Sequence, residues 1–256
     1  MKITFLGTGT SQGIPMIGCT CAVCRSADPR DQRLRASVLI TEDGVQYCID
    51  AGPDFRQQML RAGVIRLDAI LFTHAHKDHV AGLDDVRAFN YFSGKPMPLY
   101  ATKSVQRAIR REFSYAFDPR NTYPGLPRIT FRTIDNAPFS IGKLTILPVR
   151  VKHAGMPVLG FRIGDLTYIT DANHIPPREL KKISGSRILI INALRKEPHV
   201  SHFSLEEAIS IARQVRAERT YLTHISHQMG LHAEVESELP SDIRLAFDML
   251  SIELPE

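Results

Sequence analysis

Three histidines and one aspartate gather in the sequence HAHKDH, where His74, His76, Asp78 and His79 fall within six positions. Imidazole and carboxylate groups bind Zn²⁺ and related ions readily, so this cluster favours a metal site that could activate water for hydrolysis. His74 and His76 are two residues apart, and in an extended chain both rings point to the same side. Asp78 and His79 are adjacent, where the chain would turn into a helix. One pair can therefore bind one metal ion, and the second pair can bind its neighbour.

Thiols form a second cluster of potential ligands in the sequence CTCAVC, which contains Cys19, Cys21 and Cys24. In a reducing compartment this spacing favours thiolate metal ligands over disulfides. Three thiolates need a fourth ligand to close a tetrahedral zinc site, and His227 is the natural candidate. The alternative is a cluster of reactive or incidental thiols. Cys48 lies apart in an expected strand, where we predict a buried, inert thiol.

Polar residues elsewhere in the chain stand directly after strand-like runs. His153 follows LPVRVK, Asp171 follows YIT and His224 follows YLT. Sites on layered α/β folds usually lie where strands leave the core, so these residues are further candidate ligands. Taken singly, each histidine could instead be a hydrogen-bonded structural residue, and Asp171 could cap the turn that follows it.

The elements that must position these residues can be read from the hydrophobic pattern. The apolar run 67–72 has the length of a strand, so the HAHKDH cluster is expected where a strand ends and a loop begins. Glu42-Asp43-Gly44 is a hairpin signal between two further strands. We expect strands at residues 1–6, 36–41, 45–50, 67–72, 96–101, 129–133, 144–152, 158–163, 166–170, 187–192, 219–223 and 249–254.

Capping signals mark the expected helices. Asp54 and Thr102 precede helical stretches as N-caps, and Ser204 with Glu207 forms a capping box. Helices are expected at 54–62, 84–92, 102–113, 178–183, 204–216 and 233–239. The glycine-rich stretch 7–13 is expected to be a tight turn whose backbone N–H groups could attract phosphate oxygens. Strand-rich halves with helices inserted in each predict two sheets packed face to face with helices outside, in one domain covering 1–256 with an irregular, zinc-binding loop near 12–35.

The motif HxHxDH resembles the signature of the metallo-β-lactamase superfamily, whose four-layer αββα sandwich fits the expected order of elements. The resemblance implies one metal ion held by His74, His76 and His153. It implies a second ion held by Asp78, His79 and His224, with Asp171 bridging the two. Asp50 would orient ligands without binding a metal itself. Such a centre makes hydroxide from a bridging water and clamps an anionic transition state, and Asp78 is counted among the catalytic residues as well as the ligands.

The N-terminal sequences GTGTS and GIPMIGCTCAVC resemble a narrower group, the phosphoribosyl cyclic phosphodiesterases of phosphonate breakdown (PhnP-type proteins). This resemblance implies a structural zinc held by Cys19, Cys21, Cys24 and His227. It also places His202 beside the dinuclear centre, where we expect it to protonate the leaving oxygen or contact the phosphate; the alternative is a structural histidine. Arg195, Lys196 and His199 are further candidates for binding phosphate, and His174 and His232 receive no role.

These features favour a metal-dependent phosphodiesterase that hydrolyses a small cyclic or linear phosphodiester, with Zn²⁺ or Mn²⁺ as the catalytic metals. The enzyme alternative is a tRNA 3′-end endonuclease, which shares HxHxDH. Those enzymes usually carry a long arm between the bridging aspartate and the last histidine, and ordinary elements fill 171–224 here. The alternative of another class is a non-catalytic carrier resembling a pyrroloquinoline quinone biosynthesis protein. A carrier has no need to keep the full set of ligands, so catalysis is favoured.

Composition sets outer limits on the partners. The hydrophobic content is 43% and the charged content 23%, as in ordinary globular proteins. We find no apolar run that could span a bilayer and no signal segment, and we therefore expect a cytoplasmic protein without a membrane partner. The net charge of +5 suits an anionic substrate, but no dense basic run predicts a stable nucleic-acid partner. The PhnP-type resemblance also implies a homodimer.

Overall fold

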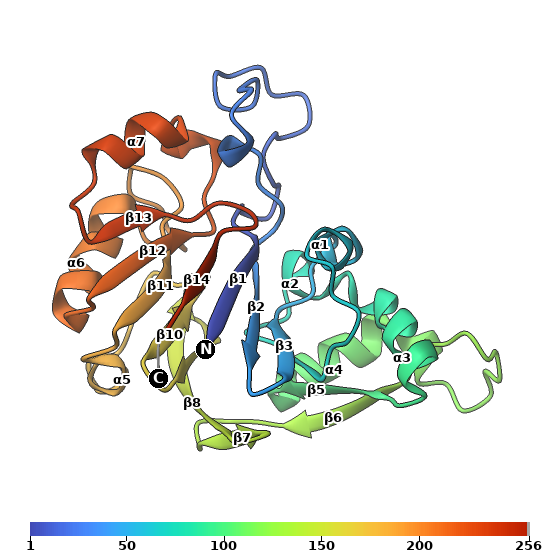
Figure 1. Ribbon diagram of the computed structural model, residues 1–256. Coiled ribbons are helices and arrows are strands. Elements are labelled where there is room, and N and C mark those ends of the chain that lie inside the picture. Colours follow the sequence, from blue (N-terminus) through green and yellow to red (C-terminus); the bar gives the residue numbers. More distant parts are fainter. Residues whose placement is uncertain (255–256) are drawn as a thin grey trace.

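The computed structural model, which describes residues 1–254, arranges the strands in two seven-stranded sheets (Figure 1). The first sheet has the order β14-β1-β2-β3-β4-β5-β6. Its bounds are β1 Lys2–Gly7, β2 Ser37–Glu42, β3 Val45–Ile49, β4 Ala69–Leu71, β5 Met97–Ala101, β6 Ile129–Thr133 and β14 Ser251–Glu253. Strands β14 to β3 pair antiparallel, and β3 to β6 pair parallel.

The second sheet has the order β13-β12-β11-β10-β9-β8-β7. Its strands β7 to β10 form an antiparallel meander, and β10 to β13 are parallel. The bounds are β7 Phe139–Ile141, β8 Leu144–His153, β9 Met156–Ile163, β10 Leu166–Ile169, β11 Ile188–Asn192, β12 Arg219–Thr223 and β13 Ile243–Leu245.

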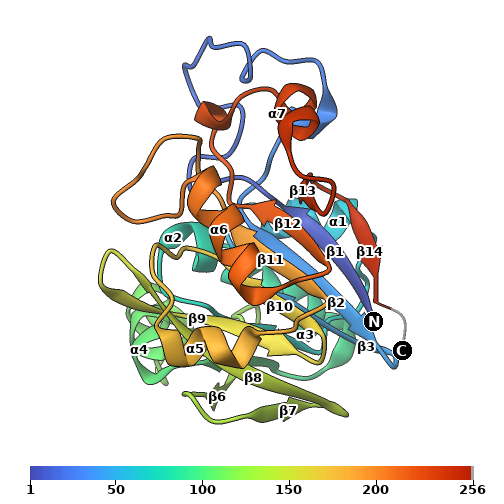
Figure 2. The ribbon, with the colours of Figure 1, turned by 90° about the vertical axis from the view of Figure 1, so that its left-hand side faces the viewer.

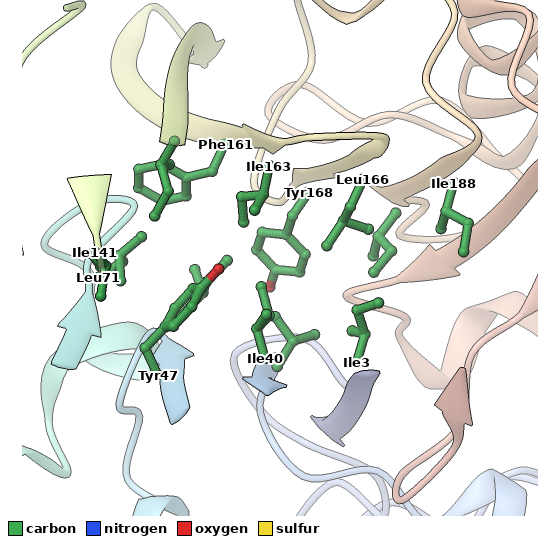
Figure 3. Close-up of a cluster of buried hydrophobic side chains, with 14 of the residues drawn as sticks. Ile3, Ile40, Tyr47, Leu71, Ile141, Phe161, Ile163, Leu166, Tyr168 and Ile188 are labelled. Carbon is green, nitrogen blue, oxygen red and sulfur yellow. The ribbon is translucent and has the colours of Figure 1, made fainter. Parts of the chain in front are cut away.

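The two sheets face each other across one apolar layer, to which Ile3, Ile40 and Tyr47 of the first sheet and Phe161 and Tyr168 of the second contribute (Figure 3). Alternate residues of a strand point to opposite faces of the sheet. Because both faces are covered, central strands such as β10 and β11 are buried at every position, whereas β5 and the end of β8 alternate. The central strands could therefore be recognised as continuous apolar runs.

Helices cover the outer faces of both sheets, which completes the αββα sandwich (Figures 1 and 2). Residues of α1, α3 and α4 share a buried cluster with the first sheet, and residues of α5, α6 and α7 share one with the second. The bounds are α1 Phe55–Arg61, α2 Lys77–Val80, α3 Arg87–Ser93, α4 Lys103–Glu112, α5 Pro177–Ile183, α6 Leu205–Val215 and α7 His232–Glu238. Within residues 1–254 no helix combines the length and the apolar character needed to cross a membrane.

The expected elements are present, with four differences. Strands β7 and β13, of three residues each, and the four-residue helix α2 were not predicted, because so short a run shows no pattern. Asp54 does stand at the N-cap of α1, but its side chain does not cap the helix. Its carboxylate accepts hydrogen bonds from the backbone and guanidinium of Arg35 instead. The capping box of Ser204 and Glu207 at α6 is confirmed.

The cysteine-bearing stretch 12–35 has no strand or helix beyond the short 3₁₀ turn Pro29–Asp31. Figure 1 shows it in blue, projecting beside α7 at one end of the sandwich. Ile14, Val23 and Cys24 form a small buried cluster there, and Leu231 packs against it. This loop therefore adjoins the start of α7.

Candidate metal centre

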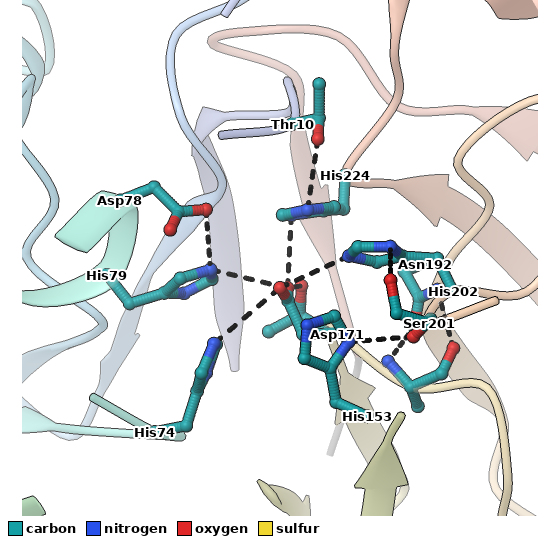
Figure 4. Close-up of polar contacts among 12 residues, drawn as sticks. Thr10, His74, Asp78, His79, His153, Asp171, Asn192, Ser201, His202 and His224 are labelled. Atoms are coloured by element: carbon teal, nitrogen blue, oxygen red, sulfur yellow. Dashed lines mark hydrogen bonds and ion pairs between the residues drawn. The ribbon is translucent and has the colours of Figure 1, made fainter. Parts of the chain in front are cut away.

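The side chains predicted to bind catalytic metals meet at one end of the sandwich (Figure 4). Each comes from a position at or just beyond a strand end or from the short helix α2. Ligand atoms lie within 4.8 Å of one another in three overlapping groups, and Asp171 belongs to all of them. The groups are Asp78, His79, Asp171 and His224; His74, His76 and Asp171; and His153, Asp171 and His202.

Asp171 is the central residue of the cluster. Its Oδ1 lies 3.3 Å from Nε2 of His79 and 3.1 Å from Nδ1 of His224. Its Oδ2 lies 3.7 Å from Nε2 of His74 and 3.4 Å from Nε2 of His202. One carboxylate thus faces two sets of histidines with different oxygens, as a bridging ligand would.

The backbone delivers three of these polar side chains at a conformational cost. Asp50, Asp171 and His224 have φ values of 66°, 51° and 56°, which is the left-handed region. Each stands at or just after the end of a strand: β3, β10 and β12. Non-glycine residues in this region cost of order 1 kcal/mol or more and concentrate at functional sites. The strain turns the side chains across the sandwich end instead of continuing the pleat.

Neighbouring groups fix which nitrogen of each histidine carries its proton. Nδ1 of His79 lies 2.7 Å from Oδ2 of Asp50, and Nδ1 of His153 lies 2.7 Å from the carbonyl oxygen of Ser201. Both acceptors require an N–H at Nδ1, which leaves the lone pair on Nε2. These are the partners that orient metal-binding histidines in proteins.

The same reasoning applies to His74. The hydroxyl of Thr73 donates its proton to Oδ2 of Asp50 at 2.8 Å, and therefore accepts from Nδ1 of His74 at 2.9 Å. The lone pair of His74 is again on Nε2. Asp50 accepts a further bond from the Thr73 amide at 2.9 Å, so one buried carboxylate orients two of the histidines.

Three ring nitrogens of the cluster are buried without a hydrogen-bond partner among the described residues: Nε2 of His74, Nε2 of His79 and Nδ1 of His224. All three face oxygens of Asp171. Burying unpaired polar atoms, and lone pairs against carboxylate oxygens, is costly unless a cation lies between them. The donor set therefore fits divalent metal ions, which accept lone pairs from imidazole and carboxylate together.

The protonation states agree with this donor set. Burial, the larger effect, lowers the pKa of His74 well below its usual value and that of His224 to about 4, so both are neutral at pH 7. Burial alone would raise the pKa of Asp171, but His224 and His79 outweigh it and hold that pKa well below its ordinary range. Neutral imidazole and ionised carboxylate are the forms that bind metals.

His79 is the exception. Burial would lower its pKa, but the carboxylates of Asp171, Asp50 and Asp78 raise it well above the usual value. Negative charge that holds a proton on His79 would hold a divalent cation in the same place, with release of the proton.

The thiol cluster comes together as predicted. Cys19, Cys21, Cys24 and His227 present ligand atoms within 4.8 Å of one another. Nδ1 of His227 lies 3.4 Å from Sγ of Cys19 and 3.3 Å from Sγ of Cys21. A tetrahedral Cys₃His zinc site fits these donors. Cys48 is fully buried in β3, and burial raises its pKa, as expected of an inert thiol.

A profile of the beta-lactamase superfamily domain matches residues 46–225, the larger part of the chain. The chain belongs to the metallo-β-lactamase superfamily. The two sheets and their helical cover are those expected from this family.

Several solved structures are similar to this chain. It resembles a crystal structure of a new diphosphatase from the PhnP family with 40% identity and a TM-score of 0.92, covering 99% of this chain and 98% of that one. Zn²⁺-bound PqqB from Methylobacterium extorquens has a TM-score of 0.78 at 21% identity, covering 99% of this chain and all of PqqB. The short form of human tRNase Z has 0.72 at 20%, covering both chains fully. The last two likenesses show the fold alone.

Curated relatives match over part of their own length. An octanoyltransferase of Porphyromonas gingivalis is 40% identical over the full chain, which spans 52% of that protein. Coenzyme PQQ synthesis protein B of Rhodopseudomonas palustris is 34% identical over 43% of this chain and 38% of its own. The chain therefore spans about half, or less, of the curated relatives it matches.

The residues expected to contact substrate differ in their placement. His202 is 9% exposed, and its ring lies 4.5 Å from that of His153 and 4.9 Å from that of His224. His199 lies beside it, with ring centroids 5.3 Å apart. The guanidinium of Arg195 instead donates to the carbonyls of Glu197 and Pro198 and to Gln228, so we do not carry Arg195 into the proposed site.

Lys196, a further candidate for binding phosphate, forms an ion pair with Glu238 at 2.8 Å, away from the histidines.

Some polar partners of the centre were not predicted from the sequence. The sequence did not single out Thr10, Thr73 or Ser201, which contact the predicted ligands His224, His74 and His153. The available signal was that Thr73 directly precedes the HAHKDH cluster and that Thr10 belongs to the GTGTS motif.

Proposed function

We propose that this chain is a metal-dependent phosphodiesterase that hydrolyses a small phosphodiester such as a cyclic ribose phosphate or a nucleotide-like diester. The observation that carries the proposal is Asp171, which faces His79 and His224 with one oxygen and His74 and His202 with the other. Two divalent metals bound by these groups would neutralise phosphate charge and lower the pKa of water. The ligands are the seven residues His74, His76, Asp78, His79, His153, Asp171 and His224, with Zn²⁺ or Mn²⁺ as the metal.

The residues around the ligands have separable tasks. Asp50 and Thr73 hold His79 and His74, and the carbonyl of Ser201 holds His153. His76 is exposed, which puts the opening of the site on its side of the cluster. His202 is not needed to complete either predicted ligand set, and its Nε2 points at Asp171. We assign His202 the transfer of a proton to the leaving oxygen.

A diphosphate is the second candidate substrate, because the structure with 40% identity over nearly the whole chain is described as a diphosphatase. The two bonds differ in their leaving group, which is an alcohol in a ribose diester and a phosphate in a diphosphate. A phosphate leaves without taking up a proton more readily than an alcohol does. Dependence on His202 therefore helps to distinguish the candidates.

The other names among the relatives receive less support. Octanoyl transfer is named for a protein of which this chain spans 52%, and the metal-site residues give acyl transfer no particular support. A tRNA 3′-end endonuclease would be expected to carry a long arm between the positions of Asp171 and His224. Here the described segment consists of α5, β11, α6 and β12 with their connections. A carrier remains the alternative of another class.

The test begins with metal content after purification without added metal. Wild-type protein is then assayed on bis(p-nitrophenyl) phosphate, a cyclic ribose phosphate and a nucleotide diphosphate ester. We expect close to three metals per chain, diester turnover, and loss of turnover in Asp171→Asn. Glu179→Gln is the matched control, since Glu179 is also fully buried but lies under β8, bonded to Arg150 and Lys182. Full metal loading without turnover on all three substrates would favour a carrier.

We also propose a homodimer. Large apolar side chains are exposed around one groove between α1 and α3: Leu60, Ile65 and Phe92 are 66%, 90% and 81% exposed. Arg56 and Asp85 line the same groove, so a second copy related by a two-fold axis could offer each charge its opposite. Exposed apolar patches of this kind mark interfaces.

Light scattering after gel filtration tests the dimer. We expect twice the chain mass for wild type and the monomer mass for Phe92→Asp. Val200→Asp is the control, because Val200 is 82% exposed on a different loop. A wild-type monomer at micromolar concentration would rule the dimer out.

A further inference from the structure

His224 is held differently from the other histidines of the centre. Its Nδ1 faces Oδ1 of Asp171 at 3.1 Å without a hydrogen-bond partner in the described chain, and its Nε2 lies 3.3 Å from the hydroxyl of Thr10. A neutral imidazole has one N–H and one lone pair. If the proton is on Nε2, the lone pair on Nδ1 points to Asp171 and is free to bind a metal. In that tautomer the hydroxyl of Thr10 accepts the hydrogen bond from Nε2–H, which is the role of the groups behind metal-binding histidines.

The segment 8–10 pairs through backbone hydrogen bonds with Ile225, the residue after His224, and this pairing holds Thr10 in place. The Thr10 amide donates to the carbonyl of Ile225 at 3.0 Å, and the Ile225 amide donates to the carbonyl of Thr8 at 2.9 Å. Gly9 pairs with Ile225 as an isolated bridge. A Cβ on Gly9 would lie 2.9 Å from the Arg33 carbonyl oxygen and 3.0 Å from its Cβ, so the close approach requires glycine. The register sets the position of Thr10 against the ring.

Thr8 is in turn held by a buried charged network. Its amide and hydroxyl donate to Oδ1 of Asp248 at 2.9 and 2.8 Å, and the guanidinium of Arg33 donates to the Thr8 hydroxyl at 2.8 Å. Arg33 also reaches Nδ1 of His232 at 3.0 Å. Thr8, Arg33, His232 and Asp248 are all at most 6% exposed. Two buried charged groups thus contact the same Thr8 hydroxyl, and moving Thr8 would cost each of them a hydrogen bond.

From these contacts we propose that Thr10 is a positioning residue for the metal ion that His224 binds. In the metal-bound form its hydroxyl accepts from Nε2–H of His224 and fixes the plane of the ring, and the segment 8–10, anchored by Asp248 and Arg33, holds it in place. The inference rests on the metal site in the proposed function. It does not depend on which substrate is hydrolysed.

The test compares Thr10→Val, which keeps the shape and removes the hydroxyl, with Thr10→Ser, which keeps the hydroxyl. Metal-free protein is titrated with Co²⁺ and with Zn²⁺ against a chelator. In Thr10→Val we expect affinity for one of the two catalytic metals to fall by about 10- to 100-fold, the usual effect of removing a partner of a metal-binding histidine. The other catalytic metal and the thiol-bound zinc should keep their affinities. The Co²⁺ absorption bands should shift in Thr10→Val and return in Thr10→Ser.

Thr133→Val serves as the control for losing a threonine hydroxyl, since that hydroxyl accepts a hydrogen bond from Gln106 and belongs to none of the histidine contacts among residues 1–254. Thermal unfolding of the metal-free proteins shows whether Thr10→Val is folded. If it is not, Thr10→Ala replaces it. Wild-type affinity and an unchanged Co²⁺ spectrum in the folded valine or alanine variant would overturn the proposal. Absence of turnover with every substrate would sink the proposed activity but leave the affinity measurement valid, so the two failures are distinguishable.

Discussion

Nδ1 of His79 lies 2.7 Å from Oδ2 of Asp50, and both side chains are completely buried. The same carboxylate accepts bonds from the amide and the hydroxyl of Thr73, which in turn contacts His74. Asp50 therefore organises a histidine from each predicted metal set without being one of the ligands. A carboxylate behind a metal-binding histidine fixes its ring and makes it a better ligand.

The first prediction concerns Asp50→Asn. The amide has nearly the same shape but no charge, so it weakens the bond from His79 while retaining an acceptor for Thr73. We expect the affinity for the catalytic metals to fall by about 10- to 100-fold. Turnover at limiting metal should fall in parallel and should recover partly when excess metal is added. Metal content after dialysis against a weak chelator is the measurement.

Glu179→Gln removes an equally buried charge outside the centre and should retain the catalytic metals. Wild-type metal content in Asp50→Asn under the same dialysis would show that Asp50 supports only the backbone after β3.

A second prediction concerns His202 and the leaving group. If His202 donates a proton to the leaving oxygen, His202→Ala should lower kcat by about 10²- to 10⁴-fold on a diester of a ribose hydroxyl. On bis(p-nitrophenyl) phosphate the loss should be less than about tenfold, because p-nitrophenolate leaves without a proton. Steady-state rates on the two substrates give the comparison.

His199→Ala is the matched variant, since His199 is a less buried ring 5.3 Å from that of His202. Because His199 is a candidate phosphate contact and not the proton donor, we expect its loss of turnover to be equal within about threefold on the two substrates. Equal losses on the two substrates in His202→Ala would assign His202 to binding or metal positioning and not to proton transfer.

The sequence was informative where function and fold depend on neighbours in the chain. Continuous apolar runs identified central strands such as β4 and β11 because both sheet faces are buried there, and His74 to His79 stand together because they follow one strand end. The thiols predicted a fourth ligand, and His227 was the candidate because it lies three residues after His224, although the structure had to show that the loop reaches it.

What could not be predicted depends on residues far apart in sequence. Thr10 and His224 are separated by 214 positions, and His153 and Ser201 by 48. Their contacts follow from which strands lie side by side. Contacts with distant residues also overrode local capping signals. Asp54 has the type and position of a helix cap, but its carboxylate accepts hydrogen bonds from the backbone and guanidinium of Arg35 instead. Arg195 suggested phosphate binding by its charge, and its own loop uses that charge.

A third prediction concerns the thiols. The backbone amide of Cys24, followed by His227, lowers the pKa of Cys21 to about 6, whereas burial raises that of Cys24 to about 11. At pH 7.5 metal-free protein therefore carries Cys21 as thiolate and Cys24 as thiol. We expect iodoacetamide to alkylate Cys21 at least about tenfold faster than Cys24. Peptide mass mapping of samples taken over time measures the two alkylation rates.

Cys48 is the internal control, because it is fully buried and should stay unmodified in the folded protein. Prior addition of one equivalent of Zn²⁺ should protect the three clustered thiols together. Faster labelling of Cys24, or labelling of Cys21 that Zn²⁺ does not slow, would contradict a zinc site built on an ionised Cys21.

The last prediction concerns the pH dependence of stability at Asp248. Burial is the largest effect on this carboxyl and raises its pKa to about 6, although Leu34, Thr8 and Arg33 favour the ionised form. The pKa of Arg33 is lowered to about 10 by the same burial, so the guanidinium remains charged across the acid range. An unfolded chain has an ordinary aspartate, with a pKa near about 4.

Because the folded pKa is the higher one, the folded protein takes up a proton between about pH 6 and pH 4 that the unfolded chain does not. This contribution to stability is complete below about pH 4 and is lost as the pH rises through 6. The free energy of unfolding of wild type, relative to Asp248→Asn, should therefore increase by on the order of 2 kcal/mol from pH 7 to pH 4.5. Urea unfolding of both proteins in excess chelator measures the difference without a contribution from metal loss.

Asp118→Asn provides a control of opposite sign. The side chain of Arg120 lowers the pKa of Asp118, so its contribution is present at neutral pH and is lost as the pH falls. Wild type should gain nothing over this variant on acidification. If the wild-type advantage over Asp248→Asn is flat or shrinks between pH 7 and pH 4.5, the folded pKa of Asp248 is not raised. Burying the ionised carboxylate of Asp248 beside Thr8 and Arg33 would then cost less free energy than its burial implies.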